Sequence, residues 1–468
     1  MTGLPTARRD WITGLGVALT AALIGLAIPA ALDDDRTLGL AFLALVAITA
    51  FGAFALRVEA VRRAGPGLAL AVGALATAFL IGFLGGDQRR IAHENTVVIL
   101  SAASVLCVLA GGVLRGALAR PRAPRWPGPG SPVPLNRRTL LWIATAIVAL
   151  SALHLASNPG GIPLLASNVD SARFSGGGGS PVRLIFVFLI GGLQWVAAIG
   201  LVTWLVRRER PRGWPLALTL VAAFLLILLA SRSLIFTPLL TLALAAAVTG
   251  RLRPSRMAAL AVIGLVALGL AGQLRSTSSG ATEADLRAAG YDGITGQITG
   301  SSAVGPWVFG KVLDRVPALH PHRGGAFFTA DFRAQFPGDQ VFGDPELPDE
   351  WVTRIRGATY GQDGVGGSPP TLPGGLYIDW GIPGIVIGCL IVGWLLAAIY
   401  DWARRVGTIG ALALYAYFTG YIMLSAYNFL SLKPLALTAM VLCFITHRVE
   451  VGARVRARRS APAVARAA

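Results

Sequence analysis

The chain has 468 residues, of which 54% are hydrophobic and only 14% are charged, and its mean hydropathy is +0.64. These values exclude an ordinary soluble globular protein and predict an all-α, polytopic membrane protein. The formal net charge of +18 does not indicate a nucleic-acid partner. The arginines stand in short segments between apolar runs, where they set topology, and form no basic patch interleaved with aromatic residues.

Apolar runs along the chain predict about twelve transmembrane helices in a single transmembrane domain, residues 1–468. The runs lie at residues 11–32, 38–56, 67–84, 96–114, 139–156, 182–206, two short helices within 215–249, 257–273, 374–400, 409–426 and 432–446. The first run is longer than the apolar region of a signal peptide, so we expect an uncleaved span. Arginine-rich segments alternate with arginine-poor ones, which predicts that both termini are cytoplasmic.

Three polar segments connect these spans. Residues 115–138 are rich in proline and arginine, and we expect a cytoplasmic linker whose composition does not pack. Residues 157–181 contain a glycine run and predict an outer loop. Residues 274–371, between helices nine and ten, hold 11 of the 23 acidic residues. Because so polar a stretch cannot lie in hydrocarbon, it predicts a long extracytoplasmic loop that carries chemistry or recognition.

Three arginines are predicted at the outer membrane face. Arg232 stands between two serines at the tip of the two short helices, and its planar fork suits a phosphate or pyrophosphate group. Arg275 follows the ninth span by one turn, and Arg173 lies beside the glycine run of the 157–181 loop. A single such arginine can instead reach lipid phosphate or cap a helix end. Together, the three would attract an anionic, lipid-linked substrate and stabilise a departing pyrophosphate.

The densest titratable group of the long loop contains His320, His322, Arg323 and Asp331. Either histidine or the carboxylate is a candidate general base for a sugar hydroxyl, and the alternative is that they are ordinary surface residues. A His-x-His pair without a second ligand pair does not predict a metal site. Since no P-loop or glycine fingerprint is present either, we expect neither a metal nor a cofactor.

The segment that leads into span ten contains Tyr377 and Asp379. Asp379 is predicted at or just below the outer interface, where an acidic residue is costly unless it is paired. We therefore expect a loop arginine as its partner. Tyr377, Asp379 and Arg323 join the three membrane-face arginines as candidate substrate-binding residues.

These features resemble the oligosaccharide repeat-unit polymerases and O-antigen ligases of bacterial envelopes. The resemblance rests on the Ser-Arg-Ser tip at Arg232, on the long outer loop, and on the Pro-Pro-Thr, Leu-Tyr and Trp-Gly-Ile-Pro-Gly sequences of residues 369–384. It covers residues from about 183 to 400. Members often carry a glutamate before the Leu-Tyr pair where this chain has Gly375, so no catalytic role is carried to that position.

The resemblance implies a metal-independent glycosyltransferase of the bacterial plasma membrane. It would polymerise polyprenyl-pyrophosphate-linked oligosaccharide repeat units into a cell-surface polysaccharide at the outer face. Outer arginines of the family are considered to engage the phosphates of the donor, a role that the resemblance carries to Arg232, Arg275 and Arg173. The implied partners are the lipid-linked glycan, membrane lipids and other polysaccharide export proteins.

Three alternatives stay open. A ligase would attach finished polymer to another envelope acceptor. A glycosyltransferase that uses a polyprenyl-monophosphate sugar would place acidic residues in the first outer loop, where Asp33, Asp34 and Asp35 lie. A transporter or lipid-linked glycan flippase would match the helix count, but it predicts polar residues along a mid-membrane pathway, and the spans contain almost none apart from Gln194.

Overall fold

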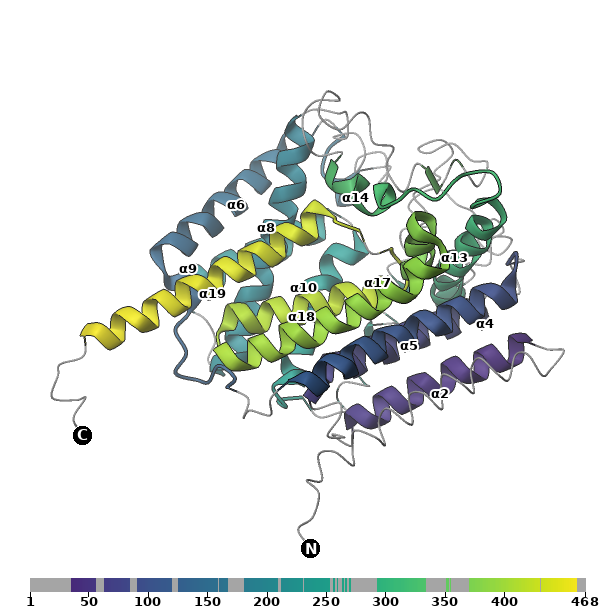
Figure 1. Cartoon of the computed structure of the whole chain (residues 1–468). Helices are drawn as coiled ribbons and strands as arrows, with labels where there is room; N and C mark the ends of the chain where they lie inside the picture. Colours follow the sequence, from purple (N-terminus) through teal and green to yellow (C-terminus); the bar gives the residue numbers. More distant parts are fainter. Residues whose placement is uncertain are drawn as a thin grey trace, which may run out of the picture.

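The computed structural model describes residues 35–55, 63–84, 91–119, 125–158, 160–166, 181–208, 212–229, 231–252, 293–333, 370–429 and 431–460, with isolated positions between 256 and 270 and at 351, 352 and 354. These residues form helices and no strand (Figure 1). The helices are α2 (Asp35–Ala55), α4 (Pro66–Leu84), α5 (Glu94–Leu118), η3 (Pro134–Asn136), α6 (Arg138–Ala156), η4 (Pro163–Leu165), α8 (Pro181–Arg207), α9 (Trp214–Leu228), α10 (Arg232–Val248), α13 (Gly293–Arg315), α14 (Ala326–Arg333), α17 (Thr371–Val406), α18 (Ile409–Leu424) and α19 (Pro434–Ser460).

Six helices in the described ranges are long and apolar enough to cross a membrane: Pro66–Leu84, Glu94–Leu118, Arg138–Ala156, Ile185–Arg207, Thr371–Val406 and Pro434–Arg456. Four shorter apolar helices accompany them: Gly39–Ala53, Trp214–Leu228, Ser233–Val248 and Ile409–Leu424. The coarse prediction of a helical, multi-pass membrane protein is therefore confirmed. The number of twelve spans and the side on which each loop lies remain predictions. The first expected span, residues 11–32, and most of 257–273 lie outside the described residues.

Helices α5 and α17 pack against each other along much of their length (Figure 1). Glycine makes this possible, because a Cβ at Gly111 would collide with the carbonyl oxygen of Leu390, and one at Gly393 would collide with that of Val108. Small residues at such crossings let two helix backbones approach closely inside a membrane. α17 is therefore held firmly along one side, with α4, α13 and α18 as further neighbours.

The single polar residue noted within the spans joins two helices. Gln194 in α8 is buried and accepts a hydrogen bond of 2.6 Å from the hydroxyl of Tyr417 in α18. An interhelical hydrogen bond of this kind satisfies a polar group that lipid would leave without a partner. Gln194 therefore has a structural role in the described packing.

The expectation that residues 115–138 do not pack is wrong for most of the segment. Helix α5 continues to Leu118, and Trp126 lies against the helical core with its ring centroid 5.9 Å from that of Tyr400. The backbone N–H of Arg125 donates to the carbonyl oxygen of Arg404 at 2.8 Å, and Leu135 is fully buried. Trp126 and Leu135 thus anchor a segment whose average composition is that of a flexible linker.

The long stretch from 274 to 371 is not a continuous loop. It contains α13, a helix of 23 residues that packs on α4 and α17. The contact with α4 is close, because a Cβ at Gly82 would lie 2.7 Å from the carbonyl oxygen of Ser302. Val308, Phe309 and Val312 are buried on the inner face of α13. The stretch is polar on average, so the apolar face of α13 is not evident from its composition. That face holds the middle of the stretch against the spans.

Candidate functional site

A break near the start of α17 creates the site. Gly381 adopts φ 66° and ψ −154°, which are not helical angles, so residues 371–380 form a short helix ahead of the long one. Pro383 follows, and proline has no backbone N–H to donate. The carbonyl groups just before the break therefore lack their normal partners four residues later and need others.

Three consecutive residues of the neighbouring loop supply those partners. They donate in register: His322 Nδ1 to Tyr377 O at 3.0 Å, Arg323 N to Ile378 O at 3.0 Å, and Gly324 N to Asp379 O at 2.9 Å. The predicted candidates His322, Arg323, Tyr377 and Asp379 are thereby brought together. What joins them is a set of hydrogen bonds to backbone carbonyl groups at a helix end, which side-chain patterns in a sequence do not reveal.

The hydrogen bond to Tyr377 selects the tautomer of the neutral His322 ring. A carbonyl oxygen can only accept, so Nδ1 must carry a proton, and Nε2 of the neutral ring is left as an acceptor. The ring stands edge-on to that of Tyr377, with 5.4 Å between centroids, and the side chain is exposed. The hydroxyl of Tyr377 in turn donates to Val316 O at 3.2 Å. His322 is therefore anchored through Nδ1, although its side chain as a whole is exposed.

Asp379 holds the first turn of α14. Its two carboxylate oxygens accept hydrogen bonds from the backbone N–H groups of Phe327 at 2.9 Å and Phe328 at 2.7 Å, and the residue is 1% exposed. Those N–H groups have no partner inside the helix, and a carboxylate also suits the positive end of the helix dipole. Arg323 adds a favourable charge, as expected for a loop arginine. The Asp379 carboxylate thus positions α14, and its predicted role in substrate binding stays a prediction.

A row of aromatic rings lies beneath the loop, with a cation at each end. The contacts, measured to ring centroids, are Arg323 on Trp351 (5.4 Å), Trp351 to Phe327 (5.8 Å), Phe327 to Phe429 (4.9 Å) and Lys433 on Phe429 (4.7 Å). His320 stands edge-on to Trp351 at 5.9 Å. Cations over aromatic faces are attracted by the ring quadrupole. Two positive groups are thus held on either side of a rigid, buried row.

Asp331 lies further along α14 and contacts the segment that leads into α19. Its Oδ2 accepts a hydrogen bond of 2.6 Å from Ser431 Oγ, and the hydroxyl of Tyr421 donates to Ser431 O at 2.8 Å. Neither Ser431 nor Lys433 was predicted from the sequence. One signal was available for the second, because lysine occurs only at positions 311 and 433 while every other basic residue is arginine.

The predicted trio of membrane-face arginines is not assembled within the described residues. Arg173 and Arg275 lie outside them, and the side chain of Arg232 is likewise not described. The backbone of Arg232 begins α10, directly after Ser231, whose hydroxyl lies 3.3 Å from that of Ser233. Helix α9 ends at Leu228 and α10 begins at Arg232, so the two short helices expected here are present.

The site can take up a proton at His322 Nε2 and offers positive charge at Arg323 and Lys433. Within the described ranges, no three His, Cys, Asp or Glu side chains stand close enough to hold a metal ion.

Comparison of the chain with protein-family models, curated proteins and solved structures finds no match.

Proposed function

We propose that the protein is a glycosyltransferase of the bacterial plasma membrane that polymerises polyprenyl-pyrophosphate-linked oligosaccharide repeat units at the outer face. One observation carries the proposal: the exposed side chain of His322 donates through Nδ1 to Tyr377 O, which leaves Nε2 of the neutral ring as an acceptor. A neutral histidine held in this way is suited to act as a general base. The resemblance in the sequence supplies the class of substrate.

In the proposed reaction, His322 Nε2 removes the proton from a hydroxyl of the acceptor sugar. The hydroxyl oxygen forms a bond to the anomeric carbon of the donor while the bond from that carbon to the pyrophosphate breaks. The electron pair leaves on the pyrophosphate, whose negative charge Arg323, the neighbour of His322, would stabilise. Asp379 and Tyr377 are positioning residues, because they fix α14 and the His322 ring. The products are a lengthened glycan and free polyprenyl pyrophosphate.

Replacing His322 by asparagine tests the role of the base. The side-chain amide of the introduced asparagine stands near the position of Nδ1 and can still donate to Tyr377 O, whereas nothing replaces Nε2. We expect H322N to be produced and to unfold like the wild type while polymerisation falls by about 10²- to 10⁴-fold, the usual contribution of a general base. His93→Asn is the matched control, since His93 is also exposed and bonds Asp314 at 2.8 Å.

Polysaccharide gels of a deletion strain complemented with each variant give the readout. Short repeat units with H322N and full-length polymer with H93N would support the proposal. Wild-type chain lengths with H322N would remove His322 from the mechanism. In the deletion itself, full-length but unattached polymer would assign a ligase. Movement of labelled lipid-linked glycan across proteoliposomes without a glycosidic product would assign a transporter.

A further inference from the structure

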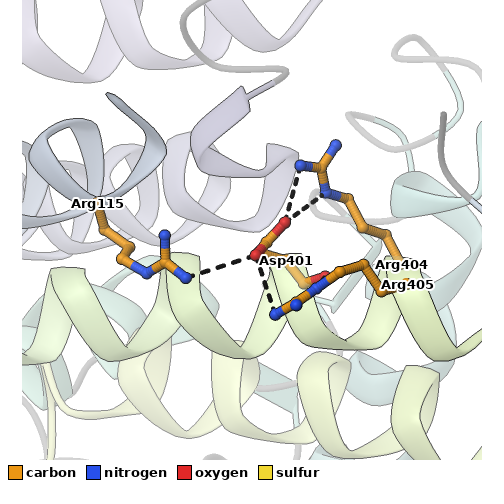
Figure 2. Close-up of polar contacts among 4 residues, drawn as sticks. All are labelled: Arg115, Asp401, Arg404 and Arg405. Carbon is orange, nitrogen blue, oxygen red and sulfur yellow. Dashed lines mark hydrogen bonds and ion pairs between the residues drawn. The ribbon is translucent and has the colours of Figure 1, made fainter. Parts of the chain in front are cut away.

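The far end of α17 carries a second polar cluster, built around one carboxylate (Figure 2). Asp401 Oδ1 accepts from Arg404 Nη2 at 2.8 Å and Nε at 3.1 Å, and Oδ2 lies 3.1 Å from Arg405 Nη2. Arg115 reaches the same oxygen from α5 at 3.4 Å. Three guanidinium groups thus meet a single carboxylate, which leaves two positive charges uncompensated within the cluster.

The cluster is more than a buried structural ion pair, because its members differ in exposure. The Arg404 side chain is only 8% exposed and donates twice to the same oxygen of Asp401. The side chains of Arg405 and Arg115 are 42% and 20% exposed. Each guanidinium carries five N–H donors, far more than one shared carboxylate oxygen can accept. Arg115 and Arg405 therefore present both charge and hydrogen-bond donors at the surface.

An apolar stripe leads along the membrane-facing side of α17 to this cluster. Its members recur at helical spacing and are exposed although large and hydrophobic: Ile387, Ile391, Trp394 and Leu395. Leu114 and Leu118 extend the surface on α5. Trp394 lies at the end of the stripe, and the Arg115 guanidinium lies 5.8 Å from its ring centroid. Tryptophan beside a cation is typical of the boundary between hydrocarbon and head groups.

The cluster lies at the opposite membrane boundary from the candidate site. At 1.5 Å per residue, Asp401 stands roughly 30 Å along α17 from Asp379, about the thickness of the hydrocarbon core. We propose that Arg115 and Arg405 bind the phosphate of an anionic phospholipid whose acyl chains lie along the apolar stripe of α17 and α5. The excess positive charge selects an anionic head group, and the stripe selects a lipid over a soluble phosphate compound.

The test measures the melting temperature of the full chain in a neutral detergent as lipid is added. Phosphatidylglycerol should raise it by several degrees, because a ligand that binds only the folded state stabilises it. Phosphatidylcholine, or inorganic phosphate at equal ionic strength, should raise it far less. The R115Q/R405Q double variant should bind phosphatidylglycerol roughly 30-fold more weakly, from about fivefold per arginine. Arg138→Gln, at the exposed start of α6, is the control and should behave like the wild type.

Equal shifts with both lipids, or a double variant that keeps the wild-type response, would overturn the proposal. An equal response to inorganic phosphate would do the same, since it would assign a simple anion site. If the double variant fails to fold, a second measurement, made on the wild-type chain, tests the proposal instead. Phosphatidylglycerol with a photoreactive acyl chain should cross-link preferentially to Leu114, Ile391, Trp394 and Leu395. Uniform labelling of all lipid-facing helices would contradict the site.

Discussion

The carboxylate of Asp379 accepts a hydrogen bond of 2.7 Å from the backbone N–H of Phe328, although the two residues belong to different helices. Asp379 lies just before the break in α17, and Phe328 lies in the first turn of α14. Asp379 therefore lies beside the break in one helix and caps the start of another. The stability of the candidate site depends on this connection.

Replacing Asp379 by alanine should lower the free energy of unfolding by about 1–3 kcal/mol, because two N–H groups in the first turn of α14 lose their acceptors. Asp379→Asn should be intermediate, since the amide keeps one acceptor oxygen. Thermal unfolding in detergent is the measurement. Asp314→Asn is the control, because this partly exposed pair with His93 contributes within about 1 kcal/mol. Equal melting temperatures for D379A and the wild type would contradict the capping role.

Glu450 should stabilise the start of α18 in the way that Asp379 stabilises the start of α14. Its oxygens accept from the backbone N–H groups of Ile409 at 3.1 Å and Gly410 at 2.8 Å, at the start of α18, and the residue is fully buried. Replacing Glu450 by alanine should therefore cost about 1–3 kcal/mol of stability. Glu94→Ala, at the less buried start of α5, should cost less. A reversed order of melting temperatures would show that Glu450 is not needed as a cap.

Gly393→Ala should disturb the contact between α5 and α17. The added Cβ would collide with the carbonyl oxygen of Val108, and backbone atoms cannot move aside as side chains do. Overpacking of this kind typically costs about 1–3 kcal/mol. Gly52→Ala in α2 is a matched control, since a Cβ there meets no atom within 4 Å and alanine favours helix by up to about 1 kcal/mol. The unfolding midpoint should fall for G393A and rise for G52A. An unchanged midpoint for G393A would contradict the close contact between α5 and α17.

Gly381→Ala tests the link between the helix break and His322. Alanine at φ 66° and ψ −154° is strained by roughly 1–3 kcal/mol, and its Cβ would lie 3.1 Å from His322 Nε2. Gly213 has a φ of 68° and no atom within 4 Å of a built Cβ, so G213A shares the strain without the contact. Both variants should lose similar stability, but only G381A should lose polymerisation. Equal activity of the two would show that His322 Nε2 is not required.

The described spans were largely predictable, because a run of apolar residues long enough to cross a membrane is visible in sequence. The separation of α9, which ends at Leu228, from α10, which begins at Arg232, was predicted too, from the serines around Arg232. Helix α13 was not, since only one of its faces is apolar. The partners of Asp379 could not be predicted either. The sequence indicated an arginine, whereas the main partners are backbone N–H groups that belong to no residue type.

Glu450 was missed for a related reason. It stands among the arginines that follow the last apolar run, where it reads as part of a solvated tail. The helix continues through this region to Ser460, and Arg454 donates to the carbonyl oxygens of Val406 and Gly407 at the C-terminal end of α17. Charge and hydropathy indicate where hydrocarbon ends. They do not indicate where a helix ends.

The hydrogen bonds that fix α14 also determine when the site can form during synthesis. Asp379 is made 52 residues after Phe327, and Ser431 is made 100 residues after Asp331. The loop with His320 and His322 therefore leaves the ribosome well before the groups that hold it. Until α17 and the start of α19 have been made, neither the first turn of α14 nor Asp331 has its partner. A chain truncated before Ser431 would carry the candidate residues without their arrangement.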